Sequence, residues 1–354
     1  MTLIDWTASM EQTFEYYIVD PGTWKDVRRI HNIKSTSISR NSQSETLGSA
    51  SMNVTDLLDE CYVRVYLIAV QNGVTEKVPL GTFLVQSPSS RFNGKVTDIT
   101  VDAYTPLIEL KESLPPLGYS VMKGDNVMSL AYRLTKEHLR APVVETSNET
   151  VLTYDFVANT DDTWMSFLTD LIAYAKYSFD LDELGRVLFS PKQSTASLQP
   201  VWTYTDDNSS ILYPDLSIDH DIFGIPNVVE VVYSKNGDIY YSRKTNDDEN
   251  SPLSIQKRGR EIVYRETNPD FPGIPSQDMI DEYAEQLLKD LSSFEHTVTY
   301  SHGYCPVRVG DCVRLNYKRA GLDGVKAKVI SQTIDCSTGC KVSETAVFTK
   351  KLWR

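Results

Sequence analysis

The sequence lacks the short motifs that mark common catalytic sites. It contains no glycine-rich phosphate loop of the form GxGxxG or GxxxxGK[ST], and neither GxSxG nor HExxH occurs. Histidine is scarce, with 5 residues among 354. His220 is flanked by Asp219 and Asp221, but residues one apart on a strand point to opposite faces, so the three do not easily converge on one site. We therefore expect no catalytic, cofactor-binding or metal-ligating residues and predict that the chain is not an enzyme.

Cysteine is also scarce, and the spacing of its residues leaves two interpretations open. Four of the 5 cysteines fall in the last 50 residues. Cys336 and Cys340 have a spacing that fits half of a zinc site, whereas Cys305 and Cys312 are too far apart for the other half. The pattern favours reduced structural cysteines, with a zinc or disulfide link between Cys336 and Cys340 as the alternative.

Long hydrophobic runs are missing. The longest, Val65 to Val70, has the length of a strand, whereas a membrane-spanning helix needs about 20 apolar residues. The first residues include Asp5 and Glu11 and lack a basic segment followed by an apolar one, which a secretion signal would require. We therefore expect no membrane insertion and predict that the chain is cytoplasmic when it is made.

The net charge of −13 is unevenly distributed. Residues 141–250 hold 6 basic and 19 acidic side chains, whereas residues 301–354 hold 10 basic and 4 acidic ones. Solvated surface explains most such bias. The functional alternatives are an acidic wall that repels nucleic acid and a basic face that binds an acidic partner. Tight binding of DNA by the whole molecule is disfavoured because phosphate neutralisation needs clustered lysine and arginine.

The first 112 residues have the pattern of antiparallel strands. Asn72-Gly73 and Asn93-Gly94 separate strand-like runs, and Asn-Gly favours the type I′ turn of a hairpin. We predict that residues 1–112 form a first β-barrel, or tube-like, domain. Asn236-Gly237 predicts a third hairpin in the second half of the chain.

The segment that follows changes its periodicity. Asp125 is the expected N-cap of a first helix, and Thr160 is the expected N-cap of a second helix that presents Trp164 on its apolar face. Tyr177–Leu181 and Arg186–Phe189 then alternate as the two strands of a hairpin. We predict an α+β domain at 113–200, with the Trp164 face as its core and not as a ligand pocket.

The chain returns to strand patterns after residue 200. A helix is expected at 276–293, where apolar residues recur at helical spacing, and three strand-like runs follow it. We predict a second β-barrel domain at 201–354, which includes a linker and this helix. The predicted fold class is mainly β, with two antiparallel barrels flanking a small helix-plus-hairpin domain.

With these elements in place, the chain resembles the baseplate hub proteins of phage tails and related contractile injection machines, the late control protein D family. The resemblance lies in the order of four segments over most of the chain. They are Leu80–Val85 with Ile99–Tyr104, Trp164–Pro191, Pro226–Val231, and Arg308–Val313.

The resemblance implies a structural role in the virion tail, at the baseplate. Hubs of this family form a homotrimeric ring with two barrels per subunit, which adapts the sixfold tail tube to the threefold central spike. The implied partners are two further copies, the spike, a tail tube or distal tail protein, and the tape-measure protein. DNA is expected only in transit through the lumen, and before assembly the chain is expected in the host cytoplasm.

Two other interpretations remain open. One is the hub module at the tip of a long non-contractile tail. The other is a carbohydrate-active or cell-wall-binding protein that uses its tyrosine-rich β surfaces, since the chain has 20 tyrosines. Sugar release from cell-wall material would distinguish the second from a structural role.

Overall fold

The computed structural model describes residues 4–92, 97–219, 223–235, 238–249, 251–269, 271, 275–292 and 294–350. The chain is mainly β, with few helices, as predicted. It divides into two compact units. The first comprises Met1–Leu216 with Thr299–Ala346, and the second comprises Ser217–Val298 with Val347–Arg354.

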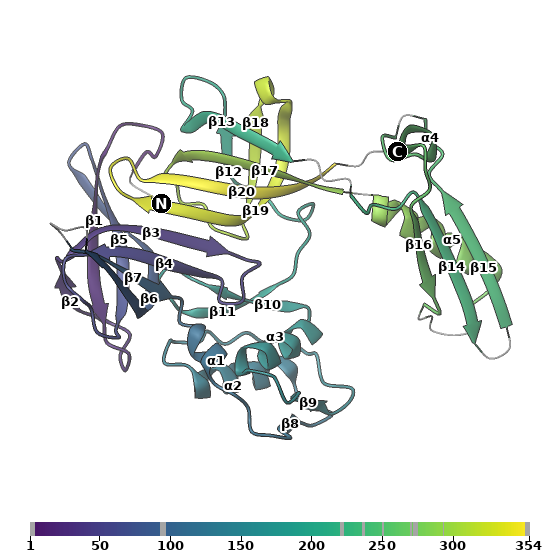
Figure 1. Ribbon diagram of the computed structural model, residues 1–354, viewed down its shortest axis with the longest axis horizontal. Coiled ribbons are helices and arrows are strands. Elements are labelled where there is room, and N and C mark those ends of the chain that lie inside the picture. The colour runs from purple at the N-terminus through teal and green to yellow at the C-terminus, as the bar shows by residue number, and fades with distance from the viewer. Residues whose placement is uncertain are drawn as a thin grey trace. The chain divides into compact units, whose positions relative to one another are not determined.

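Seven antiparallel strands make up the N-terminal part of a large sheet in the first unit (Figure 1). They are β1 (Glu11–Val19), β2 (Asp26–Ile30), β3 (Ile33–Asn41), β4 (Gly48–Val54), β5 (Tyr62–Gln71), β6 (Val74–Phe92) and β7 (Thr97–Tyr104). In β4, buried and half-buried residues alternate, because successive side chains leave a strand on opposite faces. Asn72 and Gly73 join β5 to β6 with φ values of 51° and 79°, which confirms the predicted tight turn. The Asn93-Gly94 and Asn236-Gly237 turns lie outside the described residues.

The C-terminal strands continue the same sheet. They are β12 (Pro200–Thr205), β13 (Leu212–Asp219), β17 (Phe294–Gly303), β18 (Cys312–Tyr317), β19 (Leu322–Cys336) and β20 (Lys341–Lys350), with a short 3-10 helix, η1 (Lys318–Ala320), before β19. The first part of β19 pairs with β18, and residues Ser331 to Cys336 pair with β3. This pairing joins the N-terminal and C-terminal strands into one 13-stranded sheet.

Two features of this sheet differ from the predicted pair of antiparallel barrels. Among the described strands, the sheet runs from β13 to β2 as an open path, without a closed barrel. In addition, β12 pairs with β18 in parallel. A parallel pair needs a long crossover connection, and more than a hundred residues lie between these two strands. The wholly antiparallel character predicted for the C-terminal part is therefore wrong at β12.

The helix-plus-hairpin insert lies between β7 and β12. Its elements are α1 (Ile108–Glu112), β8 (Ser120–Val121), α2 (Val127–His138), β9 (Phe156–Val157), α3 (Trp164–Tyr174), β10 (Tyr177–Leu181) and β11 (Val187–Pro191). Helices α2 and α3 and the β10–β11 hairpin confirm the predicted elements to within a few residues. The predicted caps are shifted, because Asn126 accepts from Ser129 N at the start of α2 and Thr163 forms a capping box with Ser166 at the start of α3.

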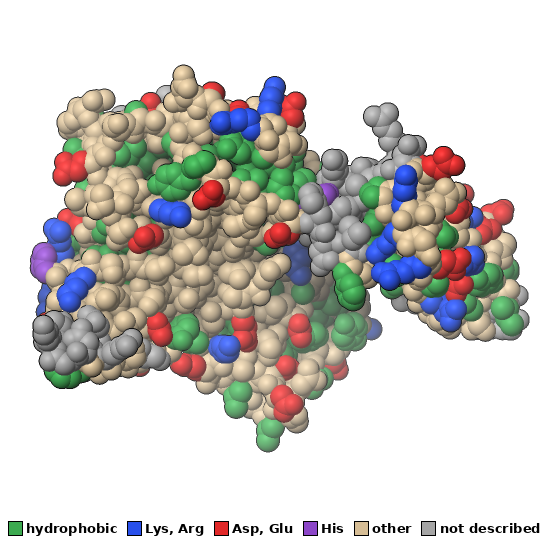
Figure 2. All heavy atoms as spheres, turned by 45° about the horizontal axis from the view of Figure 1, so that its top comes forward, with side chains coloured by type: hydrophobic (Ala, Val, Ile, Leu, Met, Phe, Trp, Pro, Cys, Tyr) green, Lys and Arg blue, Asp and Glu red, His purple; other side chains and the backbone are tan. Residues whose placement is uncertain are grey.

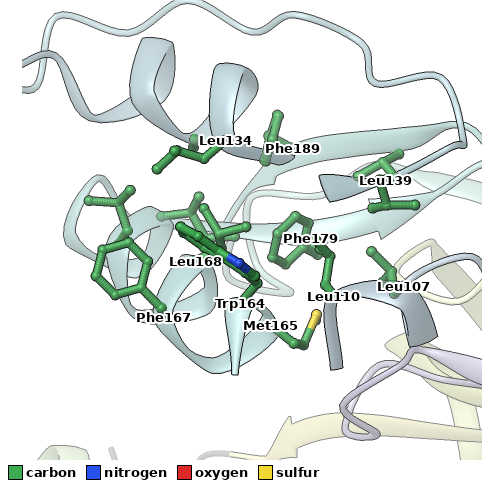
Figure 3. Packing of buried hydrophobic residues seen from close by; sticks show 14 of the residues in the cluster. Leu107, Leu110, Leu134, Leu139, Trp164, Met165, Phe167, Leu168, Phe179 and Phe189 are labelled. Carbon is green, nitrogen blue, oxygen red and sulfur yellow. The ribbon is translucent and has the colours of Figure 1, made fainter. Parts of the chain in front are cut away.

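The core of the insert confirms the role predicted for the Trp164 face (Figure 3). Trp164 is 3% exposed and stacks on His138, with 4.1 Å between the ring centroids. Phe167, Leu168, Leu171 and Ile172 lie on the same side of α3 and are buried, as the helical spacing requires. The hairpin adds Phe179 and Phe189 to this core, so helix and hairpin share one hydrophobic cluster.

The second unit contains its own small sheet. Its elements are β14 (Val228–Lys235), β15 (Asp238–Thr245), α4 (Ile255–Arg258), β16 (Val263–Thr267) and α5 (Gln277–Ser292), in the strand order β15-β14-β16. Helix α5 confirms the predicted helix at 276–293. It packs Ile280, Ala284 and Leu288 against Val229 and Val231 of β14. This unit takes its residues from within the segment 201–354. The predicted domain boundaries 1–112, 113–200 and 201–354 therefore differ from those of the two compact units. They stay predictions of where independently folding domains begin and end.

None of the described helices combines the length and the apolar character that a membrane span requires.

Candidate functional site: the hairpin tip and the sheet junction

The cysteines whose spacing left a zinc or disulfide link open are placed by the structure, whereas His220 and Asp221 are not. No group of three or more His, Cys, Asp or Glu residues in this part of the chain has an arrangement that could hold a metal ion. Cys336 and Cys340 flank the β19–β20 turn and are both buried and free. Burial raises the pKa of the Cys340 thiol to about 12, so it is a neutral thiol at physiological pH. His220 and Asp221 lie outside the described residues.

The most elaborate polar site in the first unit is built around the tip of the β10–β11 hairpin. The hairpin lies between the helices of the insert and the large sheet (Figure 1). The carbonyl oxygen of Leu184 accepts from Trp24 Nε1 at 2.7 Å and from Arg64 Nη2 at 3.1 Å. Arg64 is itself buried, and its guanidinium donates to Thr82 Oγ1 and Asp26 Oδ1, each at 2.8 Å. A fixed, desolvated arginine thus holds the tip against the N-terminal strands.

Gly185 allows this close approach. Its φ of +74° lies in the left-handed region, which glycine adopts without a Cβ penalty. A Cβ at this position would lie 2.8 Å from Thr82 Cβ and 3.2 Å from Trp24 Cζ2. Any larger residue therefore pushes the tip away from the sheet.

Glu183, two residues before Gly185, connects the tip to both halves of the large sheet. Its Oε1 lies 2.6 Å from Arg308 Nε and 3.7 Å from Arg40 Nη1. Arg308 precedes β18, and its Nη2 also donates to the Leu181 carbonyl oxygen. Arg40 belongs to β3 and donates to the Leu80 carbonyl oxygen at 2.6 Å. One carboxylate therefore bridges arginines from the N-terminal and the C-terminal strands.

A buried polar network continues from Arg40 into the C-terminal strands. Arg40 Nη1 donates to Gln332 Oε1 at 3.3 Å, and Gln332 Nε2 donates to Glu344 Oε1 at 2.5 Å. Glu344 also accepts from Tyr300 OH at 2.7 Å and lies 3.3 Å from His302 Nε2. The side chains of His302 and Glu344 have no exposed surface.

The two charged groups of this network stabilise each other. Burial by itself lowers the pKa of His302, but its contacts with Cys305 and Glu344 outweigh burial and raise the pKa to about 10. Burial by itself raises the pKa of Glu344, but the His302 hydrogen bond and charge hold it below its ordinary value, with help from Tyr300 and Gln332. At neutral pH the pair is therefore an imidazolium and a carboxylate.

This network includes a cysteine, a histidine and a carboxylate, the residue types of a nucleophilic triad. Cys305 Sγ lies 3.9 Å from His302 Nδ1, which itself lies 2.6 Å from the Gly303 carbonyl oxygen. All three side chains are buried, and none of them lines the large cavity of this unit. The arrangement can hold a buried charge pair and fix the positions of its side chains, but it presents no nucleophile to a substrate in that cavity.

A cavity of about 900 Å³ lies next to the hairpin. Its walls come from the β3–β4 connection, β6, α3, the β10–β11 hairpin and the loop at Arg308–Asp311, all in the first unit. Burial raises the pKa of Asp311 on this wall. The volume falls in the range of about 300–1,000 Å³ that is typical of ligand sites.

The surface charge is mixed in the view of Figure 2. Acidic and basic side chains are interspersed on the visible face, so the acidic wall considered from the sequence is not seen on that side.

Sequence reasoning found the hairpin but missed its docking site. Arg308, Asp311 and Glu183 lie in segments that carried the family resemblance, yet no local signal marked Glu183, Arg40 or Glu344 as part of a site. Their partners lie far away in the chain; Arg40 and Gln332 are 292 positions apart.

Comparison with known proteins supports the fold. No protein-family model matches the sequence, and no curated protein does so either. Solved structures do match it at probability 1.00. The tail protein from Neisseria meningitidis MC58 has a TM-score of 0.66 at 13% identity. The matched region covers 95% of this chain and 96% of the Neisseria protein. The 43 kDa tail protein of prophage MuSo2 from Shewanella oneidensis has a TM-score of 0.64 at 10% identity. The matched region covers 96% of this chain and 100% of the prophage protein.

A third similar structure is the prophage tail protein gp18 from Listeria monocytogenes EGD-e, with a TM-score of 0.51 at 12% identity and 94% of each chain covered. The chain thus has the fold of phage tail proteins over nearly its whole length. The resemblance inferred from the order of four sequence segments is confirmed at the level of the fold.

Proposed function

We propose that the chain is a structural baseplate hub of a phage tail and not an enzyme. In this proposal three copies form a ring that adapts the sixfold tail tube to the threefold central spike. The ring leaves a lumen for DNA and the tape-measure protein. The fold shared with phage tail proteins over at least 94% of the chain carries the proposal.

The construction of the large sheet supports this role. Strands β3 and β19 join an N-terminal and a C-terminal set of strands edge to edge within one chain. Two tube-like surfaces per subunit would give six in a trimer, which is the symmetry match that an adaptor needs. The arginine and glutamate contacts at the hairpin tip fix the insert against both sets, as a load-transmitting part requires.

Light scattering of the purified chain tests the proposal. The expected mass is about 120 kDa, three times the 40.0 kDa of one chain, and electron micrographs should show a ring with a central hole. Mixing the chain with the spike and tube proteins of the same tail should produce a larger complex. A strictly monomeric chain that binds neither would contradict the proposal. Sugar release from cell-wall material, lost on changing single carboxylates, would favour the carbohydrate-active alternative.

A further inference from the structure

One end of the insert is formed by two antiparallel segments, residues 119–126 and 151–158. β8 pairs with β9 at one end of these segments, and Asn126 forms a bridge with Val151 at the other. Figure 1 shows β8 and β9 on the side of α2 and α3 that faces away from the β10–β11 hairpin. The two segments therefore lie side by side at an outer end of the first unit.

Large apolar side chains of this region are exposed to solvent. Five of them are about half exposed or more: Leu117 (87%), Met122 (61%), Val157 (55%), Tyr154 (54%) and Val151 (47%). We call the surface that these five side chains form the β8–β9 face. Val121 and Leu152 of the same segments are buried in the core of the insert, so that core is filled without the exposed five. Exposed apolar side chains that lie together, unlike those scattered singly, mark interaction sites.

The charge around the β8–β9 face is negative. Residues 117–127 and 149–162 contain five acidic side chains and one basic one, Lys123. The acidic residues are Asp125, Glu149, Asp155, Asp161 and Asp162. None of these five lies within ion-pair distance of a lysine or arginine of the described residues. Arg133, on the neighbouring helix α2, pairs with Glu137 and so adds no net charge. The excess of negative charge therefore has no counter-charge within the described part of the chain.

The apolar character and the charge of this face together restrict its occupant. Nucleic acids and anionic lipid headgroups carry negative charge, so the uncompensated carboxylates repel them. A second copy of the chain carries a net charge of −13 and is disfavoured for the same reason. A protein surface with an apolar centre and with lysine or arginine at its rim complements both the exposed side chains and the charge.

We propose that the β8–β9 face binds a partner protein through a surface that is apolar at its centre and basic at its rim. Burial of Leu117 and Met122, the two most exposed of the five side chains, supplies most of the affinity. The carboxylates speed association and orient the partner. This inference goes beyond the hub proposal, since it concerns the insert alone and uses no contact between copies in a ring.

Peptide selection against the full-length chain supplies a probe for this face. Random peptides of about 15 residues, long enough for about four helical turns, are displayed and selected for binding. We expect the enriched peptides to combine large apolar residues with lysine and arginine. The synthesised peptides are then titrated by fluorescence polarisation against the parent chain and four double variants.

Two of these variants measure the apolar contribution. Leu117→Ser with Met122→Ser should weaken peptide binding at least about tenfold, because burial of each side chain contributes more free energy than a tenfold change in affinity requires. Val27→Ser with Leu57→Ser is the matched control in the N-terminal part of the chain, at side chains that are 66% and 63% exposed. This control should leave the affinity unchanged. Circular dichroism should show the parent fold for both variants, since all four side chains lie largely in solvent.

The other two variants measure the contribution of charge. Glu149→Gln with Asp161→Asn should weaken peptide binding at low salt and have little effect at about 1 M salt, where exposed charges more than about 3 Å apart are screened. Glu11→Gln with Asp59→Asn removes the same charge from exposed sites in the N-terminal part of the chain. This control should leave the affinity unchanged at either salt concentration.

Several outcomes would overturn the proposal. They include failure to enrich any peptide, enrichment of acidic peptides, and affinities that Leu117→Ser with Met122→Ser leaves unchanged or that the controls lower equally. Light scattering should give the same mass for the parent and this variant, whether or not the parent is a trimer. A change in mass would assign the face to a second copy. Binding to anionic lipid vesicles that this variant abolishes would assign it to a membrane, and either result contradicts a basic protein partner.

Discussion

Replacing Gly185 by alanine tests whether the hairpin tip is held against the sheet. Two costs are expected. A non-glycine residue at φ of +74° costs about 1–2 kcal/mol, because Cβ approaches the following carbonyl oxygen. The new Cβ also lies 2.8 Å from Thr82 Cβ, well inside van der Waals contact, and overpacking of this kind costs about 1–3 kcal/mol. The free energy of unfolding should therefore fall by about 2–5 kcal/mol.

Gly118→Ala separates the two costs. Gly118 has the same φ of +74°, but a Cβ there meets nothing within 4 Å. Urea unfolding followed by circular dichroism should show a loss of about 1–2 kcal/mol for Gly118→Ala, since only the backbone cost applies. Gly185→Ala should lose more of the free energy of unfolding than Gly118→Ala, and the difference is the cost of the contact with Thr82 and Trp24. Equal losses for the two variants would refute the reasoning, because the tip would then not be packed against the N-terminal strands.

Three further predictions concern the cores of the first unit. Glu344→Gln leaves the buried His302 imidazolium without its counter-charge and should cost about 3–5 kcal/mol by urea unfolding, whereas Glu145→Gln at an exposed site should not change the midpoint. The folded pKa of His302, about 10, lies above the unfolded value, so its contribution is complete below about pH 6.5 and is lost as the pH rises toward 10. Urea midpoints should decline over this range, and His302→Gln should flatten the decline. Trp164→Ala should cost about 3–5 kcal/mol, and a thermal midpoint within one degree of the parent would contradict its place in the core.

The elements that the sequence predicted well are those defined by neighbouring residues. Helices α2, α3 and α5 and the β10–β11 hairpin follow from apolar residues at helical or alternating spacing, and the Asn72-Gly73 turn follows from the positive φ that both residues tolerate. The caps were misplaced by one to three residues, because Asp125 and Asn126, or Thr160 and Thr163, are chemically similar candidates within one turn.

The candidate site could not be predicted in the same way. Leu184 carries no side-chain signal for its role, since its carbonyl oxygen receives the hydrogen bonds from Trp24 and Arg64. Glu183 is one of 48 acidic residues, and nothing near it in the sequence distinguishes it from a solvated surface carboxylate. Its importance comes from Arg40 and Arg308, which only the folded sheet brings to it.

The sequence by itself determined the secondary structure, the mainly β class and the order of segments that links the chain to tail proteins. Side-chain periodicity and turn chemistry act over a few residues, so they can be read without a fold. The tertiary structure decided the pairing of β19 with β3, the parallel β12–β18 pair, the separate unit around α5, and the His302–Glu344 network. These features join residues that are tens to hundreds of positions apart, and their free energy depends on burial that exists only once the sheet has formed.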